Sequence, residues 1–359
     1  MINLNSPLKP DLNKLHSYLE RVNESGWFTN FGPLHNELTH RLEDFLGVKN
    51  LLLVNNGTLA LQVAAKALET KSILATPFSF VATISAFKWQ KDDVAFADVD
   101  RETYNLSPQA IKNAIANNCK ADTLVATHVY GNPCDVVAID TLAQKFNMKT
   151  IYDAAHAFGI KVHDQSVLKY GDASILSFHA TKVFHTIEGG AVVFKQKQHF
   201  EKAKQLINFG INSNGVISGD GINAKLNEYQ AAVGLVNIKN IDNILYRRAE
   251  LFTKYSGLLK SIVEIPTWHA SANINGAYFV IALKNKTQRD KLVIDLNKKS
   301  IQSRCYFSPS LDEIYKNIKS YGIENSRHIA DRVLCLPLHA YMTDADVELV
   351  VNTIKESVK

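Results

Sequence analysis

Short apolar runs alternate with helical patterns between about residue 50 and residue 195. Several of the runs are almost entirely apolar, which is typical of strands that are covered on both faces of a sheet. The predicted strands are Leu51–Val54, Ser72–Leu74, Val94–Ala97, Thr123–Thr127, Thr150–Tyr152, Ile175–Phe178 and Ala191–Phe194, and the predicted helices between them are Leu59–Leu68, Pro108–Asn117 and Val137–Phe146. This alternation predicts an α/β fold whose parallel or mixed sheet carries helices on both faces.

The pattern changes after a long helical stretch at Leu226–Leu245. Helical and strand patterns still alternate beyond it, but fully apolar runs are fewer, which indicates a smaller α+β domain. We therefore expect residues 1–240 to form an N-terminal segment and a large domain, and residues 241–359 to form a small domain. In the small domain we expect helices at Arg247–Leu259, Gln288–Asn297 and Asp344–Ser357, and strands at Gly276–Leu283 and Ser303–Phe307.

Composition and charge narrow the class of protein. The 359 residues are 46% hydrophobic, which is enough for one large core and a smaller domain. The net charge is +5, but the basic residues are scattered, so we predict no nucleic-acid partner. The N-terminus lacks the pattern of a signal peptide, and no apolar run approaches the length of a membrane span, so we predict no membrane association.

The four cysteines bear on metal binding and on the cellular compartment. Cys119, Cys134, Cys305 and Cys335 have spacings that suit neither a zinc site nor a disulfide framework. We therefore predict no metal site and a reducing, cytoplasmic compartment.

Lys182 lies in a polar turn between two apolar strands, in the run Ser177–Gly190 (SFHATKVFHTIEGG). Burial between strands disfavours the ammonium form and lowers the pKa of the amine, so the neutral amine needed for Schiff-base chemistry becomes accessible. Taken alone, the same segment also fits a lysine on a solvated hairpin.

Three further features follow predicted strands. The run Asn55–Thr58 (NNGT) begins a helix, where free N–H groups suit a phosphate or simply form a helix cap. Asp153 could bond a protonated pyridine nitrogen or cap a helix. Phe80 could stack on a flat cofactor ring or lie in the core.

The order of these features is more specific than any one of them. Ligands bind beyond the carboxyl ends of the strands in such sheets, and these residues all follow strands, so they are expected to converge. A phosphate loop, an aromatic ring, a carboxylate and a lysine are the four contacts that hold pyridoxal phosphate (PLP): its phosphate, ring face, pyridine nitrogen and aldehyde.

The motifs then point to a family. Gly26–Pro33 (GWFTNFGP), Asn56–Thr58, Tyr152–Gly159 (YDAAHAFG), Ser177–Gly190 and Leu336–His339 (LPLH) resemble the DegT-type nucleotide-sugar aminotransferases, which are fold-type-I PLP enzymes. The resemblance covers almost the whole chain. It implies a large PLP-binding domain with a mixed, mostly parallel sheet and a smaller C-terminal α+β domain.

The resemblance also implies roles for individual residues. Lys182 would bond the cofactor aldehyde, Asp153 would face the pyridine nitrogen, and His156 would lie near the 3-hydroxyl, so we expect these three to be catalytic. The other implied cofactor contacts are Gly57, Thr58 and Ser177 at the phosphate, Phe80 on the ring, and Asn223 at the phosphate of the neighbouring subunit. A homodimer with shared active sites follows from the last role. We expect Trp27, Thr29, Lys225 and Tyr306 to contact the substrate.

The implied activity is transfer of an amino group. One branch of the family has a His at the position of Lys182 and consists of dehydratases, so this chain falls on the aminotransferase side. The segment Arg304–Pro309 (RCYFSP) is similar to a Tyr-Phe-x-Pro pattern of transaminases that make dTDP-4-amino-4,6-dideoxyglucose. L-glutamate and a dTDP-linked 4-keto-6-deoxyhexose are then the expected substrates, and surface polysaccharide (O-antigen, lipopolysaccharide) biosynthesis the expected setting. A 3-keto nucleotide sugar, a PLP-dependent dehydratase and a non-catalytic regulator remain alternatives.

Overall fold

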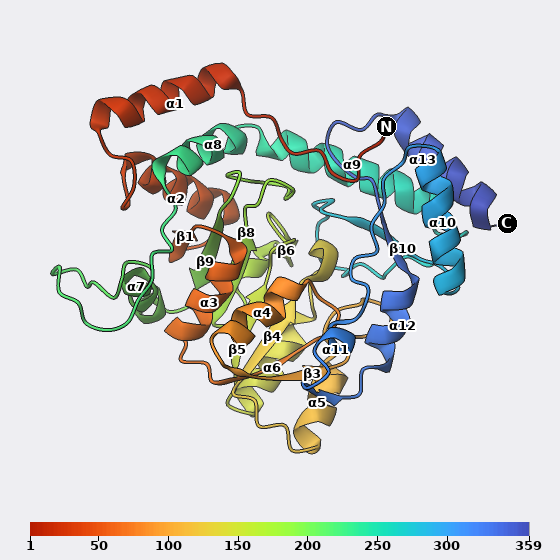
Figure 1. The fold of residues 1–359 in the computed structure, drawn as a ribbon, viewed down its shortest axis with the longest axis horizontal. Helices are drawn as coiled ribbons and strands as arrows, with labels where there is room; N and C mark the ends of the chain where they lie inside the picture. The colour runs from red at the N-terminus through yellow and green to blue at the C-terminus, as the bar shows by residue number, and fades with distance from the viewer. Residues whose placement is uncertain (359) are drawn as a thin grey trace.

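A computed structural model describes residues 1–358 and has an eight-stranded sheet at its centre (Figure 1). The strand order is β1-β9-β8-β5-β4-β2-β3-β11. Strand β9 runs antiparallel to its neighbours β1 and β8, and the other neighbours pair in parallel. The strands are β1 (Leu51–Val54), β2 (Ser72–Ala75), β3 (Asp93–Ala97), β4 (Thr123–Thr127), β5 (Lys149–Asp153), β8 (Ala173–Ser177), β9 (Gly190–Phe194) and β11 (Lys319–Tyr321). The expected α/β fold with a mixed, mostly parallel sheet is confirmed.

Helices cover both faces of the sheet because alternate strand residues point to opposite faces. Leu51 and Leu53 belong to one apolar core, whereas Leu52 and Val54 belong to another. The first core contains residues of α2 (Pro33–Leu46), α5 (Pro108–Ala116), α6 (Val136–Lys145) and α8 (Glu228–Ile238), and α1 (Leu12–Ser25) lies over α8. The second contains residues of α3 (Gly57–Ala67), α4 (Val81–Trp89) and α7 (Lys197–Leu206). Two short strands, β6 (Lys161–Val162) and β7 (Gln165–Ser166), form a separate hairpin.

The residues after 240 form a third apolar core of their own. Their elements are α9 (Ile241–Leu259), β10 (Phe279–Ala282), α10 (Lys286–Lys298), α11 (Leu311–Ile314), α12 (Glu324–Arg332), β12 (Val333–Leu336) and α13 (Asp344–Val358), in addition to β11. Strands β10 and β12 pair antiparallel, but β11 leaves this part and pairs with β3 at the edge of the large sheet. The division of the chain near residue 240 stays a prediction, and its last residue, Lys359, lies outside the described residues.

Two of the elements expected from the sequence differ in the structure. The helix expected at Leu226–Leu245 is divided, since α8 ends at Ile238 and Asn240 has a non-helical backbone before α9. The strand expected at Ser303–Phe307 is wrong: it contributes only one bridge, between Arg304 and Cys335. The chain turns there instead, and the N–H of Ser308 donates to the carbonyl of Cys305 at 2.8 Å.

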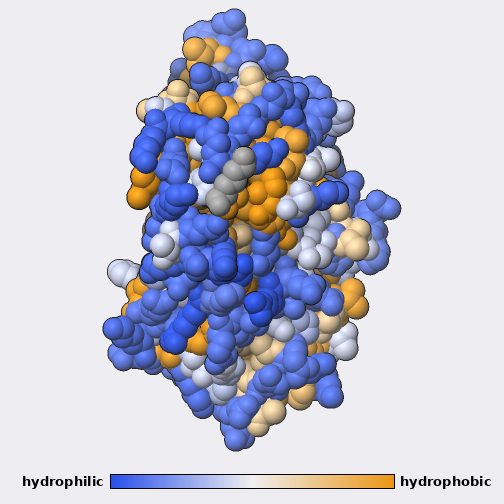
Figure 2. Space-filling view, turned by 90° about the vertical axis from the view of Figure 1, so that its right-hand side faces the viewer, coloured by the Kyte–Doolittle hydropathy of each residue, from blue (hydrophilic) through white to orange (hydrophobic). Residues whose placement is uncertain are grey.

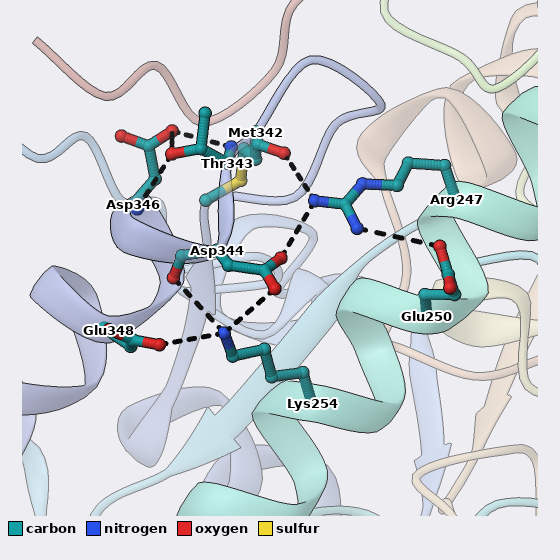
Figure 3. Close-up of polar contacts among 8 residues, drawn as sticks. All are labelled: Arg247, Glu250, Lys254, Met342, Thr343, Asp344, Asp346 and Glu348. Carbon is teal, nitrogen blue, oxygen red and sulfur yellow. Dashed lines mark hydrogen bonds and ion pairs between the residues drawn. The ribbon is translucent and has the colours of Figure 1, made fainter.

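Ion pairs fasten α13 to α9, as Figure 3 shows. Asp344 accepts from Arg247 at 3.0 Å and pairs with Lys254 at 3.3 Å, and Lys254 also reaches Glu348 at 3.0 Å. An acidic residue in the first turn of a helix also interacts favourably with the helix dipole. Asp344 therefore stabilises the beginning of α13 while it holds that helix against α9.

The side of the molecule that carries α10, α12 and α13 is largely hydrophilic, with an apolar patch in its upper part (Figure 2). Exposed ion pairs such as Lys286–Asp331 and Lys299–Glu356 belong to these helices. Within residues 1–358, none of the helices combines the length and the apolar character that crossing a membrane requires.

A buried carboxylate joins α8 to the beginning of α2. Glu228 is 1% exposed, and its two oxygens accept the N–H groups of Leu34 and His35, each at 2.7 Å. The N-cap residue of α2, Gly32, has no side-chain oxygen that could do so. The N–H of Glu228 donates to the carbonyl of Phe28 at 3.0 Å. Glu228 therefore fixes the segment that leads from α1 to α2.

Replacing this carboxylate should destabilise the fold. In Glu228→Gln, an amide NH2 group would face a backbone N–H, so we expect the free energy of unfolding to fall by about 1.5–3 kcal/mol. The midpoint of urea-induced unfolding measures the loss. Glu24→Gln, on the exposed side of α1, is the matched control and should leave the midpoint unchanged. Equal midpoints for both variants would show that Glu228 is dispensable for the stability of this junction.

Candidate active site

The carboxyl ends of β1, β2, β4, β5 and β8 meet at one edge of the sheet because these strands run in the same direction. A cavity of about 350 Å³ lies beyond this edge. Its polar and aromatic lining residues include Asn56, Gly57, Thr58, Ser79, Phe80, Thr83, Thr127, Asp153, His156, Ser177, His179, Lys182, Glu188, Tyr278, Tyr306 and Phe307. Larger hollows lie elsewhere on the surface, but Lys182, Asp153 and His156 line this one.

Lys182 and Asp153 form the charged centre of the cavity. Burial lowers the pKa of Lys182 to about 8, although the nearby Asp153 carboxylate acts in the opposite direction. Burial raises the pKa of Asp153 above its ordinary value, against hydrogen bonds from the hydroxyl of Thr83 at 2.7 Å and the N–H of Ala155 at 3.1 Å. An amine that is partly neutral near physiological pH can act as a nucleophile and as a proton carrier.

His156 presents an unsatisfied nitrogen. The side chain is 7% exposed, and its Nδ1 has no hydrogen-bond partner among residues 1–358. Burial, with a smaller contribution from Lys182, holds the pKa of His156 well below its ordinary value, so the imidazole is neutral. Its ring lies parallel to that of Phe307, with centroids 6.1 Å apart. A buried polar atom that lacks a partner favours a ligand that can form a hydrogen bond with it.

The beginning of α3 is suited to an anion. Asn56 caps this helix: its side chain accepts the N–H of Leu59 at 2.8 Å, and its carbonyl accepts the N–H of Ala60 at 3.0 Å. Within residues 1–358, the N–H groups of Gly57 and Thr58 have no acceptor. A Cβ atom added to Gly57 would lie 3.0 Å from Cβ of Ser177, so the glycine keeps this end of the cavity open. Free N–H groups and the positive end of the helix dipole together favour a phosphate.

Eight of the residues selected from the sequence line the cavity together: Gly57, Thr58, Phe80, Asp153, His156, Ser177, Lys182 and Tyr306. Phe80, at the N-cap of α4, is 52% exposed. This exposure leaves its ring free to stack on a ligand in the cavity. Their individual roles toward a ligand stay predictions.

The other four selected residues do not line the cavity. Trp27 is half exposed and donates from Nε1 to the carbonyl of Asn30 at 3.3 Å. Thr29 and Asn223 are exposed, and Nζ of Lys225 donates to Asn208 at 3.0 Å. None of the four lines the cavity of a single chain, and the roles predicted for them stay predictions.

Several lining residues were not selected from the sequence. Ser79 and Thr83 stand on either side of Phe80, and their spacing of four residues at a helix start was a usable signal. Thr127 is the last residue of a predicted strand, whereas Asp153 follows one, so the search at strand ends had to include the final strand residue to find it. Tyr278 and Phe307 come from the C-terminal part of the chain, whose approach to the cavity no local pattern reveals.

The cavity has the groups that hold PLP: a helix N-terminus for the phosphate, a carboxylate for the pyridine nitrogen and an amine for the aldehyde. The fold and this cavity place the protein in the class of PLP-dependent enzymes. Residues 11–355 match the DegT/DnrJ/EryC1/StrS aminotransferase family, and the chain belongs to this family.

Named relatives resemble the chain over nearly its whole length. A dTDP-4-amino-4,6-dideoxy-D-glucose transaminase of Shigella dysenteriae is 40% identical, over 98% of this chain and 97% of its own length. A transaminase of the same name from Escherichia coli is 35% identical, over 99% and 97%. The solved structure of DesI in the presence of its TDP-sugar product has a TM-score of 0.93 at 29% identity and covers 99% of this chain and 93% of its own.

These comparisons confirm the resemblance to the DegT-type nucleotide-sugar aminotransferases. The chain is a PLP-dependent aminotransferase, and pyridoxal phosphate is its cofactor, as expected from the sequence.

The lowered pKa of Lys182 should be measurable in the cofactor-free protein. We expect competitive acetylation, followed by mass spectrometry, to label Lys182 with a midpoint near pH 8. Asp153→Asn should lower this midpoint further, because the carboxylate that stabilises the ammonium form is lost. Lys254 is the internal control: Glu348 and Asp344 raise its pKa, so it should stay unlabelled at pH 8. If Lys182 were labelled only at the pH that labels Lys254, the proposed burial effect would be absent.

Proposed function

We propose that this enzyme transfers the amino group of L-glutamate to C4 of a dTDP-linked 4-keto-6-deoxyhexose, giving dTDP-4-amino-4,6-dideoxyglucose. The observation that carries the chemistry is the convergence of Lys182, Asp153, His156 and the α3 N-terminus on one cavity. The choice of sugar is supported by the two relatives named for this product, at 40% and 35% identity.

When bound, pyridoxal phosphate supplies a carbonyl that receives amino groups and an electron-poor ring that stabilises negative charge. The residues of the chain supply proton transfer and the positioning of the cofactor. The amine of Lys182 has a pKa of about 8, so it can take a proton from one carbon and return it to another near neutral pH. The N–H groups of Gly57 and Thr58 would hold the phosphate and so orient the cofactor toward Lys182.

Asp153 and His156 set the charge around the ring. A carboxylate beside the pyridine nitrogen keeps that nitrogen protonated, which strengthens the ring as an electron sink. A neutral His156, with a free Nδ1, can exchange a hydrogen bond with the 3-hydroxyl without adding positive charge. Phe80 would cover the exposed face of the ring.

The sugar would enter past Tyr306, the residue of the Tyr-Phe-x-Pro segment that lines the cavity beside Phe307. An aromatic ring packs well on the apolar face of a hexose or on a nucleotide base. A relative named dTDP-3-amino-3,6-dideoxy-alpha-D-galactopyranose transaminase is 26% identical, so the C4 product is better supported than the C3 product.

The proposed activity also suggests the pathway and the cellular compartment in which the enzyme works. An amino sugar on a nucleotide carrier suits the synthesis of surface polysaccharide, including the O-antigen of lipopolysaccharide, and we place the enzyme in the cytoplasm. In keeping with a reducing compartment, the structure gives all four cysteines as free thiols, two of them buried.

The substrate can be tested directly. Purified enzyme with L-glutamate should consume dTDP-4-keto-6-deoxyglucose and release 2-oxoglutarate, and mass spectrometry with NMR should show an amine at C4. Lys182→Ala should lose this activity completely, because the covalent anchor and the proton carrier are the same amine. Consumption of a 3-keto isomer, with the 4-keto compound untouched, would contradict the proposed position of amination.

We further propose that the enzyme is a homodimer in which Asn223 contacts the cofactor phosphate of the neighbouring subunit. Asn223 is exposed and does not line the cavity of its own chain. The segment around it carries apolar side chains that are also exposed, among them Phe209 (51%), Ile217 (73%) and Ile222 (45%). Exposed apolar side chains of this kind favour burial against a second subunit.

Mixed dimers distinguish a shared site from a self-contained one. Asn223→Ala should weaken cofactor binding, and Lys182→Ala should be inactive. If sites are shared, a mixed dimer of the two variants has one site with both defects and one with neither, so activity should return after subunit exchange. Verified exchange without any recovery would mean that Asn223 serves its own subunit or neither.

A further inference from the structure

Three hydroxyl groups lead from the sheet to Asp153. Thr83 Oγ1 donates to Oδ2 of Asp153 at 2.7 Å. Ser79 Oγ lies 2.8 Å from Thr83 Oγ1, and Thr127 Oγ1 lies 3.2 Å from Ser79 Oγ. All four side chains are nearly inaccessible to solvent, with exposed fractions between 1% and 5%. Each also lines the cavity, so the row of hydroxyls belongs to its wall.

The direction of every hydrogen bond in this row follows from the charge on Asp153. An ionised carboxylate only accepts, so Thr83 must use its single proton on Asp153. The bond between Thr83 and Ser79 then needs the proton of Ser79, and the bond between Ser79 and Thr127 needs the proton of Thr127. The row is therefore a one-way chain of donors that ends on the carboxylate. In such a chain each bond polarises the next and strengthens it.

The carboxylate needs this support because it is buried. Desolvation favours its neutral form, and the groups that act against it are the hydroxyl of Thr83, the N–H of Ala155 and the charge of Lys182. Ala155 donates to Oδ1 and Thr83 to Oδ2, so both oxygens are held and the plane of the carboxylate is fixed. A carboxyl group that kept its own proton would no longer hold a proton on a neighbouring pyridine nitrogen.

We propose that Thr83 is a positioning residue of this enzyme, which orients the Asp153 carboxylate and keeps it ionised through the donor chain Thr127–Ser79–Thr83. The inference rests on the role of Asp153 in the proposed function. It adds a residue that touches Asp153 and makes no claim about which substrate is aminated.

The first experiment uses the cofactor-free protein and Thr83→Val, which keeps the shape of the side chain and removes the donor. The pKa of Asp153 is raised in the folded state, so its contribution to stability is complete below the unfolded pKa and is lost as the pH rises. Without Thr83 the pKa of Asp153 should rise further and this loss should grow. We expect the melting temperature of Thr83→Val to fall below that of the parent by little at pH 4 and by several degrees more at pH 7.

Two comparisons separate this effect from a packing defect. In the Asp153→Asn background, Thr83→Val should cost the same at pH 4 and pH 7, since no carboxylate remains to be supported. Thr83→Ser, which keeps the donor, should restore the parental pH dependence. Thr141→Val is the matched control, because the Thr141 hydroxyl donates to a backbone carbonyl on the exposed side of α6. A loss that is equal at both pH values in both backgrounds would overturn the proposal.

The second experiment uses the PLP-loaded enzyme. Thr83→Val should lower kcat by about tenfold or more, the factor that corresponds to one hydrogen bond to a charged group, with KM for the sugar nearly unchanged. Thr83→Ser should recover most of the rate. An unchanged kcat in Thr83→Val would also overturn the proposal. If the sugar prediction fails instead, the pH-dependent melting still reports on the chain alone, so the two failures are distinguishable.

Discussion

Asp153 is a carboxylate with an exposed fraction of only 5%, and several neighbouring groups offset the free-energy cost of burying its charge. An isolated ionised carboxylate in a protein interior is expensive unless it is paired and hydrogen-bonded. Here the hydrogen bonds come from Thr83 and Ala155, and the nearby charge of Lys182 also favours the ionised carboxylate. The parallel sheet makes this arrangement possible, because the carboxyl ends of β2, β5 and β8 deliver these groups to the same edge. The same burial lowers the pKa of Lys182, so one constraint prepares both reacting groups.

Buried carboxylates also connect distant elements elsewhere in the fold. Asp98, just after β3, accepts the N–H groups of Asn325 and Ser326 at 2.8 Å each and the hydroxyl of Ser326 at 2.6 Å. The N-cap residue of α12, Ile323, has no side-chain oxygen, so Asp98 caps this helix from the large sheet. Glu228 does the same for α2. In both helices a distant acid replaces the local cap, which ties the folding of the helix to the packing of another element.

The sequence predicts those strands and site residues well that depend on local hydrophobic periodicity. Apolar runs located β1 to β5, β8 and β9 but not the two-residue strands β6 and β7. The residues that follow the located strands, such as Gly57, Asp153 and Lys182, were recognisable because strand ends converge in a parallel sheet. The donor chain was not predicted because Ser79 and Thr83 meet Thr127 and Asp153, which lie more than forty residues further along the sequence, only in the folded state. Strand β11 (Lys319–Tyr321) was not predicted for a related reason. It is short, and its partner β3 lies more than two hundred residues away in the sequence. The strand expected at Ser303–Phe307 is not formed because the chain turns after Arg304 and places Tyr306 and Phe307 in the wall of the cavity.

The segment Ser303–Phe307 also shows which side of the cavity each part of the chain forms. Phe307 lies parallel to Tyr130 and to His156, with ring centroids 5.9 and 6.1 Å apart, and the hydroxyl of Tyr130 donates to the carbonyl of Tyr306. Within the cavity of one chain, the sheet edge thus supplies the groups that would contact the cofactor's phosphate, pyridine nitrogen and aldehyde, whereas the C-terminal part supplies the aromatic residues Tyr278, Tyr306 and Phe307. Phe307 faces His156 through a parallel ring and not through a directed hydrogen bond, so a different side chain at this position would leave the hydrogen bonds of Asp153 in place. Substitutions at Tyr306 or Phe307 would therefore change the shape of the cavity, and with it the fit of a sugar. They would leave the charge interaction between Asp153 and Lys182 undisturbed.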